Sequence, residues 1–176
     1  EYTHYRDGQA SYAYQPGTGT GGDVWFGGSG GAPRVGNYDH ATVLHEVGHA
    51  LGLDHAHAAG RYGAVAKAWD SPEFTVMTYR AWEGADPVGY RFERWGAPQT
   101  YMMLDIAALQ EIYGADYRVN GGDTVYSWKQ GSGRTWVDGE VGLDPGGDVV
   151  FATIWDGGGR DCYDLTAYRA DLALDL

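Results

Sequence analysis

The stretch His45-Glu46-Val47-Gly48-His49-Ala50-Leu51-Gly52-Leu53-Asp54-His55 decides how this chain is interpreted. It has the form H-E-x-x-H-x-x-G-x-x-H. Apolar side chains recur at helical spacing across residues 40–51, so we expect a helix there, with Asp39 as its N-cap. His45 and His49, one turn apart, would then point from the same face of the helix. Two imidazoles in that arrangement can bind one zinc ion.

The third histidine can reach the other two only if the helix ends between them. Six residues of continued helix give about 9 Å of rise and about 600° of rotation, which would carry His55 away from His49. Gly52 removes this obstacle, because glycine readily adopts the left-handed conformation that ends a helix and turns the chain back. We therefore expect one catalytic zinc ion bound by His45, His49 and His55, with a coordination position left open for water or substrate.

Glu46 lies about 100° around the helix from His45, so it is not expected to bind the same metal ion. Its carboxylate can reach the water that the metal activates. There it would act as the general base and pass the proton on to the leaving amine. This pattern predicts metal-assisted hydrolysis of peptide bonds.

Beyond these eleven residues, the sequence resembles the metzincin zinc peptidases, and among them the serralysin branch of peptidase family M10. Residues 75–79, Thr-Val-Met-Thr-Tyr, resemble its Met-turn, and residues 96–114 resemble the helix that follows there. The resemblance covers about residues 10–176. It implies that Met77 forms an apolar floor beneath the histidines. It also implies that Tyr79 is an extra zinc ligand at rest and a hydrogen-bond donor to the oxyanion during catalysis. Ala56 stands where the family commonly has a proline.

The expected fold is α+β. The resemblance implies a twisted sheet beside the zinc helix, a lower part that contains the Met-turn, and then the start of a β-rich calcium-binding module. After Asp116, short β-type runs alternate with turns rich in glycine and aspartate. We therefore expect a metzincin catalytic domain at 1–115 and the calcium module at 116–176. A second helix is predicted at 101–113, and short strands are predicted at 10–15, 24–26, 124–126, 135–137 and 149–155.

Two loops rich in glycine and aspartate follow the second helix, at 120–124 and 156–161. Ca²⁺ prefers six to eight oxygen ligands from carboxylates and carbonyls, and glycine lets the backbone bend so that carbonyls converge. The resemblance assigns at least one structural calcium ion to these loops. Its ligands would come from Asn120, Gly122, Thr124, Asp156, Gly158 and Asp161.

Composition narrows the choice of partners and compartment. The formal net charge of −12 disfavours nucleic acid and an anionic membrane as partners, because both require basic patches. The single cysteine, Cys162, excludes an intrachain disulfide framework. The first residues carry no signal-peptide pattern. From the resemblance we expect a secreted, extracellular bacterial protein without an N-terminal signal peptide.

Two other functions stay open at this stage. The chain could be a catalytically silent calcium-binding or secretion module that retains a zinc helix, or a zinc hydrolase that does not cleave peptides. The family has a longer N-terminal part, so we expect this chain to be a piece of a longer protein. Protein or peptide substrates are the expected partners. The resemblance implies a substrate cleft between the twisted sheet and the lower part, and a propeptide, a proteinaceous inhibitor or the missing N-terminal segment could also occupy that cleft.

Overall fold

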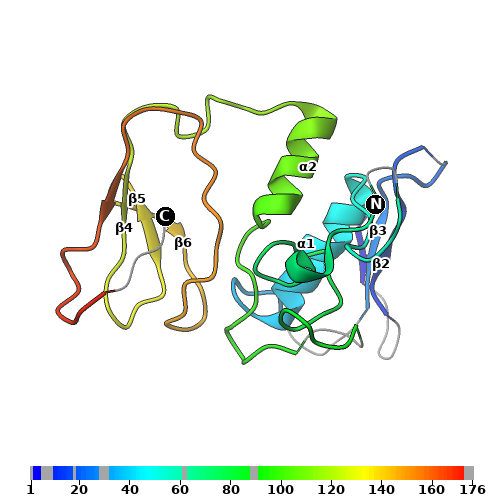
Figure 1. Cartoon of the computed structure of the whole chain (residues 1–176), viewed down its shortest axis with the longest axis horizontal. Helices are drawn as coiled ribbons and strands as arrows, with labels where there is room; N and C mark the ends of the chain where they lie inside the picture. Colours follow the sequence, from blue (N-terminus) through cyan, green and yellow to red (C-terminus); the bar gives the residue numbers. More distant parts are fainter. Residues whose placement is uncertain are drawn as a thin grey trace.

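A computed structural model describes residues 2–4, 10–17, 19–27, 32–60, 63–87 and 91–172. It confirms a mixed α+β fold. Two small sheets lie at opposite ends of the molecule and the two α-helices lie between them (Figure 1). The first sheet has the order β1-β3-β2, and the second has the order β6-β5-β4-β7. The strands are β1 (Tyr2–His4), β2 (Tyr12–Ala13), β3 (Val24–Phe26), β4 (Val125–Ser127), β5 (Thr135–Val137), β6 (Glu140–Leu143) and β7 (Cys162–Asp164).

Helix α1 (Tyr38–Ala50) carries the first two histidines of the motif. Its N-cap is Asn37, whose side chain accepts a hydrogen bond from the His40 N–H at 2.8 Å. The prediction of Asp39 as the cap is therefore wrong. Asp39 lies instead in the first turn, where its negative charge interacts favourably with the positive end of the helix dipole. Asn and Asp are about equally good caps, and the helix begins at the earlier of the two.

The C-terminal end of α1 turns as the sequence predicts. Gly52 has a φ of 98°. The Gly52 N–H donates to the His49 carbonyl and the Leu53 N–H donates to the Gly48 carbonyl, both at 2.9 Å. This pair of bonds is a Schellman motif, which satisfies carbonyls that the helix end would leave without partners. The chain therefore reverses direction immediately before His55.

Helix α2 (Met103–Tyr113) begins two residues later than predicted and ends at Gly114, whose φ is 85°. The small apolar core beside it consists of Leu53, Val76, Met77 and Met102, each 5% exposed or less. Leu44 of α1 and Leu109 of α2 pack against this cluster, so both helices share one core. In the described part of the chain, no helix has the length and hydropathy needed to span a lipid bilayer.

The strands agree only partly with the predictions. Strands β3 and β5 match, β4 is shifted by one residue, and only Tyr12–Ala13 of the expected strand at 10–15 pairs in a sheet. Residues 149–155 form no strand, contrary to expectation. They run as an extended segment that bonds to residues 99–100, with the Gln99 N–H donating to the Phe151 carbonyl at 2.9 Å. Strands β1, β6 and β7 were not predicted from the sequence.

Candidate metal centre

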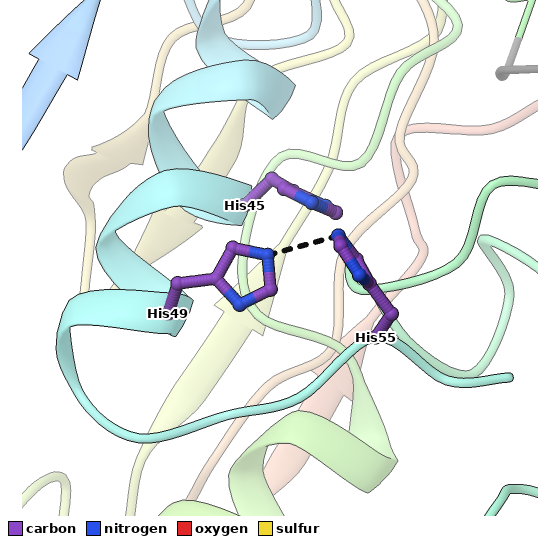
Figure 2. A group of neighbouring side chains, drawn as sticks. All are labelled: His45, His49 and His55. Atoms are coloured by element: carbon purple, nitrogen blue, oxygen red, sulfur yellow. Dashed lines mark hydrogen bonds between the residues drawn. The ribbon is translucent and has the colours of Figure 1, made fainter. Parts of the chain in front are cut away.

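The three histidines of the motif converge on one point. One ring nitrogen from each of His45, His49 and His55 can be chosen so that all three atoms lie within 4.8 Å of one another. Figure 2 shows His45 and His49 extending from α1, and His55 reaching back toward them from the following loop. The Nε2 atoms of His49 and His55 are 3.0 Å apart. The turn at Gly52 thus brings together side chains that a continuous helix would separate.

Backbone carbonyls hold two of these imidazoles from behind. The Nδ1 of His45 donates to the Val76 carbonyl at 2.8 Å, and the Nδ1 of His49 donates to the Leu53 carbonyl at 2.7 Å. A carbonyl can only accept, so these bonds place the proton on Nδ1, and Nε2 is then the nitrogen whose lone pair can bind a metal ion. These two bonds fix the orientation of the His45 and His49 rings.

The electrostatic environment keeps the cluster neutral. Burial, with smaller contributions from the nearby His49 and His55, lowers the pKa of His45 from 6.5 to about 4. Burial likewise lowers the pKa of His55 to about 4 and lowers that of His49. Metal binding requires unprotonated imidazoles, so no proton has to be displaced at neutral pH.

The donor set suits zinc. Three imidazole nitrogens are a ligand set that Zn²⁺ accepts, and bonds of about 2.0–2.1 Å in a tetrahedron separate the ligand atoms by roughly 3.3 Å. The spacing of 3.0 Å between the nitrogens of His49 and His55 is close to that separation. The residues present therefore fit a zinc ion that leaves a fourth position open.

Glu46 and Tyr79 lie beside the histidines. Glu46 is 7% exposed, and burial raises the pKa of its carboxyl from 4.5 to about 7. The Tyr79 ring lies 4.4 Å from the His55 ring and 5.7 Å from the His45 ring, between centroids. Burial raises the pKa of the Tyr79 phenol, and the Glu46 carboxylate contributes, so the two groups share one electrostatic environment.

Met77 lies under the C-terminal half of α1. It is 2% exposed, and a Cβ added at Gly48 would lie only 2.7 Å from its sulfur. Gly48 therefore gives the thioether room to approach the helix between His45 and His49. That Met77 forms an apolar floor beneath the histidines stays a prediction.

Sequence reasoning missed two buried carboxylates that hold the segment around Met77. Asp105 of α2 accepts hydrogen bonds from Thr75 Oγ1 at 2.6 Å, from the Val76 N–H at 2.8 Å and from the Met102 N–H at 2.9 Å. Asp70 accepts from Thr78 Oγ1 at 2.5 Å and from Arg80 Nε at 2.8 Å. No local pattern could have assigned these partners, because Asp105 acts 29 to 30 residues away from Thr75 and Val76.

His57 also lies at the rim of the cluster, where no role was predicted for it. It is exposed, and its ring stacks on that of His55, with 5.4 Å between centroids and 7° between planes.

The two glycine-rich loops of the C-terminal part contact each other. Thr124 Oγ1 donates to the carbonyls of Asn120 and Gly122 at 3.3 and 3.1 Å, and the Thr124 N–H donates to Asp161 Oδ1 at 3.0 Å. Gly159 passes so close that an added Cβ would lie 2.1 Å from the Gly122 carbonyl oxygen. Oxygens from both loops are therefore gathered around Thr124.

Asp156 belongs to the same neighbourhood. One of its carboxylate oxygens accepts from the Tyr126 hydroxyl at 2.5 Å, and the other accepts from the Gly158 N–H at 2.9 Å. The amide of Asn120 donates to the same hydroxyl at 3.0 Å. Tyr126, which is 1% exposed, therefore connects the predicted ligands Asn120 and Asp156.

Comparison with known proteins shows which family this chain resembles. Residues 115–176 match the family described as Peptidase M10 serralysin C terminal. The chain is 31% identical over 192 residues to Metallopeptidase AprA of Pseudomonas marginalis, covering 99% of this chain and 39% of that protein. It is 34% identical to Serralysin of Proteus mirabilis over 178 residues, covering 94% and 34% of the two chains. It is also 34% identical to Serralysin C of Dickeya chrysanthemi over 179 residues, covering 96% and 36%.

These matches confirm the resemblance to the serralysin family over most of the chain. They also show that the chain spans only 34–39% of the length of these three relatives.

Proposed function

We propose that this relative of the serralysins is a zinc-dependent endopeptidase. The observation that carries the proposal is the convergence of three neutral imidazoles beside a buried glutamate. His45, His49 and His55 would hold the zinc ion. When bound, the ion would lower the pKa of water and polarise the scissile carbonyl.

Glu46 is the proposed general base. Its carboxylate would accept a proton from the attacking water as the water oxygen bonds to the carbonyl carbon. It would then donate that proton to the amine nitrogen as the peptide bond breaks. A carboxyl whose pKa is raised to about 7 by burial is suited to both steps near neutral pH.

Tyr79 is the proposed electrophilic partner. Its ring lies against His45 and His55, and its protonated phenol can donate a hydrogen bond to the oxyanion that develops on the carbonyl oxygen. We also propose that it binds the zinc ion in the resting enzyme. The substrate would add as an extended strand to an edge of the first sheet, for example to β2, which is one of its two edge strands in the described part of the chain.

We further propose that residues 1–115 form a metzincin catalytic domain and residues 116–176 the start of a calcium-binding module. The oxygens gathered around Thr124 and Asp156 support at least one structural calcium ion, bound through the predicted residues of both loops. The protein would act outside the cell on protein or peptide substrates. A propeptide, a proteinaceous inhibitor or a further N-terminal segment would occupy the same cleft.

A fluorogenic peptide assay with and without a zinc chelator tests the proposal. The wild-type chain should cleave the peptide, and chelation should abolish cleavage. Glu46→Gln should retain one zinc ion per chain but lose at least about 10² in kcat, as expected for removal of a general base. Cleavage that survives chelation, or an unchanged rate in Glu46→Gln, would refute the mechanism.

The alternative is a catalytically silent calcium-binding or secretion module that retains the zinc helix. It is favoured by one observation, namely that the family match covers only residues 115–176. This alternative predicts binding of both zinc and calcium with no cleavage of any peptide.

A further inference from the structure

Tyr79 lies between two residues that one buried carboxylate holds. Asp70, which is 3% exposed, accepts a hydrogen bond from Thr78 Oγ1 through one oxygen and from Arg80 Nε through the other, at 2.5 and 2.8 Å. Thr78 and Arg80 are the immediate neighbours of Tyr79 in the chain. The carboxylate therefore holds the side chains on both sides of that tyrosine.

Two more bonds close the arrangement. The Arg80 N–H donates to Thr78 Oγ1 at 3.0 Å, which bridges the backbone across Tyr79. The Arg80 guanidinium also donates to the Ala85 carbonyl, which ties it to the segment that follows. The segment from Thr78 to Arg80 is held by hydrogen bonds that do not involve the phenol, so the position of the Tyr79 Cα does not depend on what its hydroxyl binds.

We call the bonds of Asp70 to Thr78 and Arg80 the Asp70 clamp. A second set of bonds, the Asp105 clamp, holds the residues just before Met77. Asp105 holds Thr75 and Val76, and the Val76 carbonyl in turn holds His45. Met77 lies between the two clamps. Asp105 is thus connected to a proposed metal-binding histidine, whereas the side-chain bonds of Asp70 in the described part of the chain lead to the segment that carries Tyr79.

We propose that Asp70 is a positioning residue for Tyr79, and that the two buried aspartates have separate roles. Asp70 sets the place from which the phenol reaches the reacting carbonyl, and Asp105 sets the orientation of His45. The kinetic part of this inference rests on the proposed function, whereas the structural part does not.

The chemistry of the clamp defines the variants. In Asp70→Asn, one side-chain oxygen can still accept from Thr78, but the amide NH₂ would face the Arg80 Nε–H, and two donors cannot bond. Thr78→Val removes the bridging hydroxyl at nearly constant shape, while Thr78→Ser retains it. Asp144→Asn is the matched control, because Asp144 pairs with Arg134 at 2.7 Å on the surface, where both side chains are about half exposed.

The kinetic test is a double-mutant cycle with Tyr79→Phe. Asp70→Asn and Thr78→Val should each lower kcat about tenfold or more, with KM changed less than about twofold, because a small misplacement of a catalytic group is enough for such a loss. Thr78→Ser and Asp144→Asn should behave as wild type. In the Tyr79→Phe background, Asp70→Asn should lower kcat by less than about twofold. An equal loss in both backgrounds would overturn the proposal.

Metal affinity separates the two clamps. Asp105→Asn should weaken zinc binding about tenfold, a usual effect of losing support behind a ligand, and Asp70→Asn should leave it within about twofold. A loss of zinc affinity in Asp70→Asn equal to that in Asp105→Asn would contradict separate roles.

Amide hydrogen exchange of the metal-free chain tests the clamp without any activity. Asp70→Asn should speed exchange at the Arg80 amide and leave the Val76 amide protected, and Asp105→Asn should do the reverse. Unchanged exchange at Arg80 would overturn the proposal. If the wild-type chain cleaves no peptide, the proposed function fails while this exchange pattern still decides whether the clamp exists.

Discussion

Replacing Asp105 should reveal how strongly the structure depends on a single buried carboxylate. Asp105 is 2% exposed, and it accepts hydrogen bonds from one hydroxyl and two backbone N–H groups that are themselves buried. Asp105→Ala leaves all three donors without an acceptor. At about 1–3 kcal/mol for each of the three buried polar groups that lose their partner, the loss should be about 3–9 kcal/mol. Small domains are stable by only about 5–15 kcal/mol in total, so this variant should be barely folded.

Asp105→Asn should cost less, and its cost should depend on pH. Burial raises the pKa of Asp105 from 3.8 to about 6, against the lowering effect of its three hydrogen bonds. A raised pKa means that the folded state holds its proton more tightly than the unfolded state. The stabilisation by this group is therefore fully present below about pH 4 and is lost as the pH rises through about 6.

The shift of roughly two pKa units corresponds to about 3 kcal/mol over the whole range, of which about 1 kcal/mol falls between pH 5 and pH 7.5. The neutral asparagine does not titrate, so the stability difference between wild type and Asp105→Asn should shrink by about that amount as the pH rises. Urea unfolding followed by tryptophan fluorescence, with chelator present, measures both variants at the two pH values. A difference that grows with pH, or a loss below about 1 kcal/mol in Asp105→Ala, would refute the reasoning.

Three further changes test other parts of the structure. Gly48→Ala places a Cβ 2.7 Å from the Met77 sulfur and should lower the free energy of unfolding by about 1–3 kcal/mol in urea titrations; a more stable variant would show that the contact can relax. Zinc at 100 times its Kd should raise that free energy by about 2.7 kcal/mol in wild type and by much less in His49→Ala, and equal gains would place the ion elsewhere. Tyr126→Phe removes the hydroxyl that bonds Asp156 at 2.5 Å, so it should weaken calcium binding in calorimetric titrations, and unchanged affinity would separate Asp156 from the ion.

The part of the site that is encoded locally could be predicted from the sequence. The spacing of His45 and His49, and a glycine placed to stop the helix, were enough to predict that His55 turns back toward them. The observed φ of 98° at Gly52 and the Schellman bonds show why. A helix end is decided by a few neighbouring residues, so its signal is contained in a short window of sequence.

The parts that depend on distant partners could not be predicted. Residues 149–155 have the composition of a strand, yet single hydrogen bonds tie them to residues 99–100 in place of a ladder. A strand requires a neighbouring strand, and composition does not reveal whether one is present. Asp70 and Asp105 are similar cases, because an isolated aspartate in a sequence gives no sign that its partners are buried turn residues.

The histidines themselves show this division. His49 is held by the carbonyl of Leu53, four residues away and within the motif, and it lies 3.0 Å from His55. The helix end therefore orients His49 and turns the chain so that His55 comes close to it. His45 is held by Val76, 31 residues away, and Val76 is held by Asp105. The His45 ring is thus held in place only when the segment around Val76 and helix α2 have packed against α1. Residues 45–55 supply the ligands, but the complete site requires the fold around them.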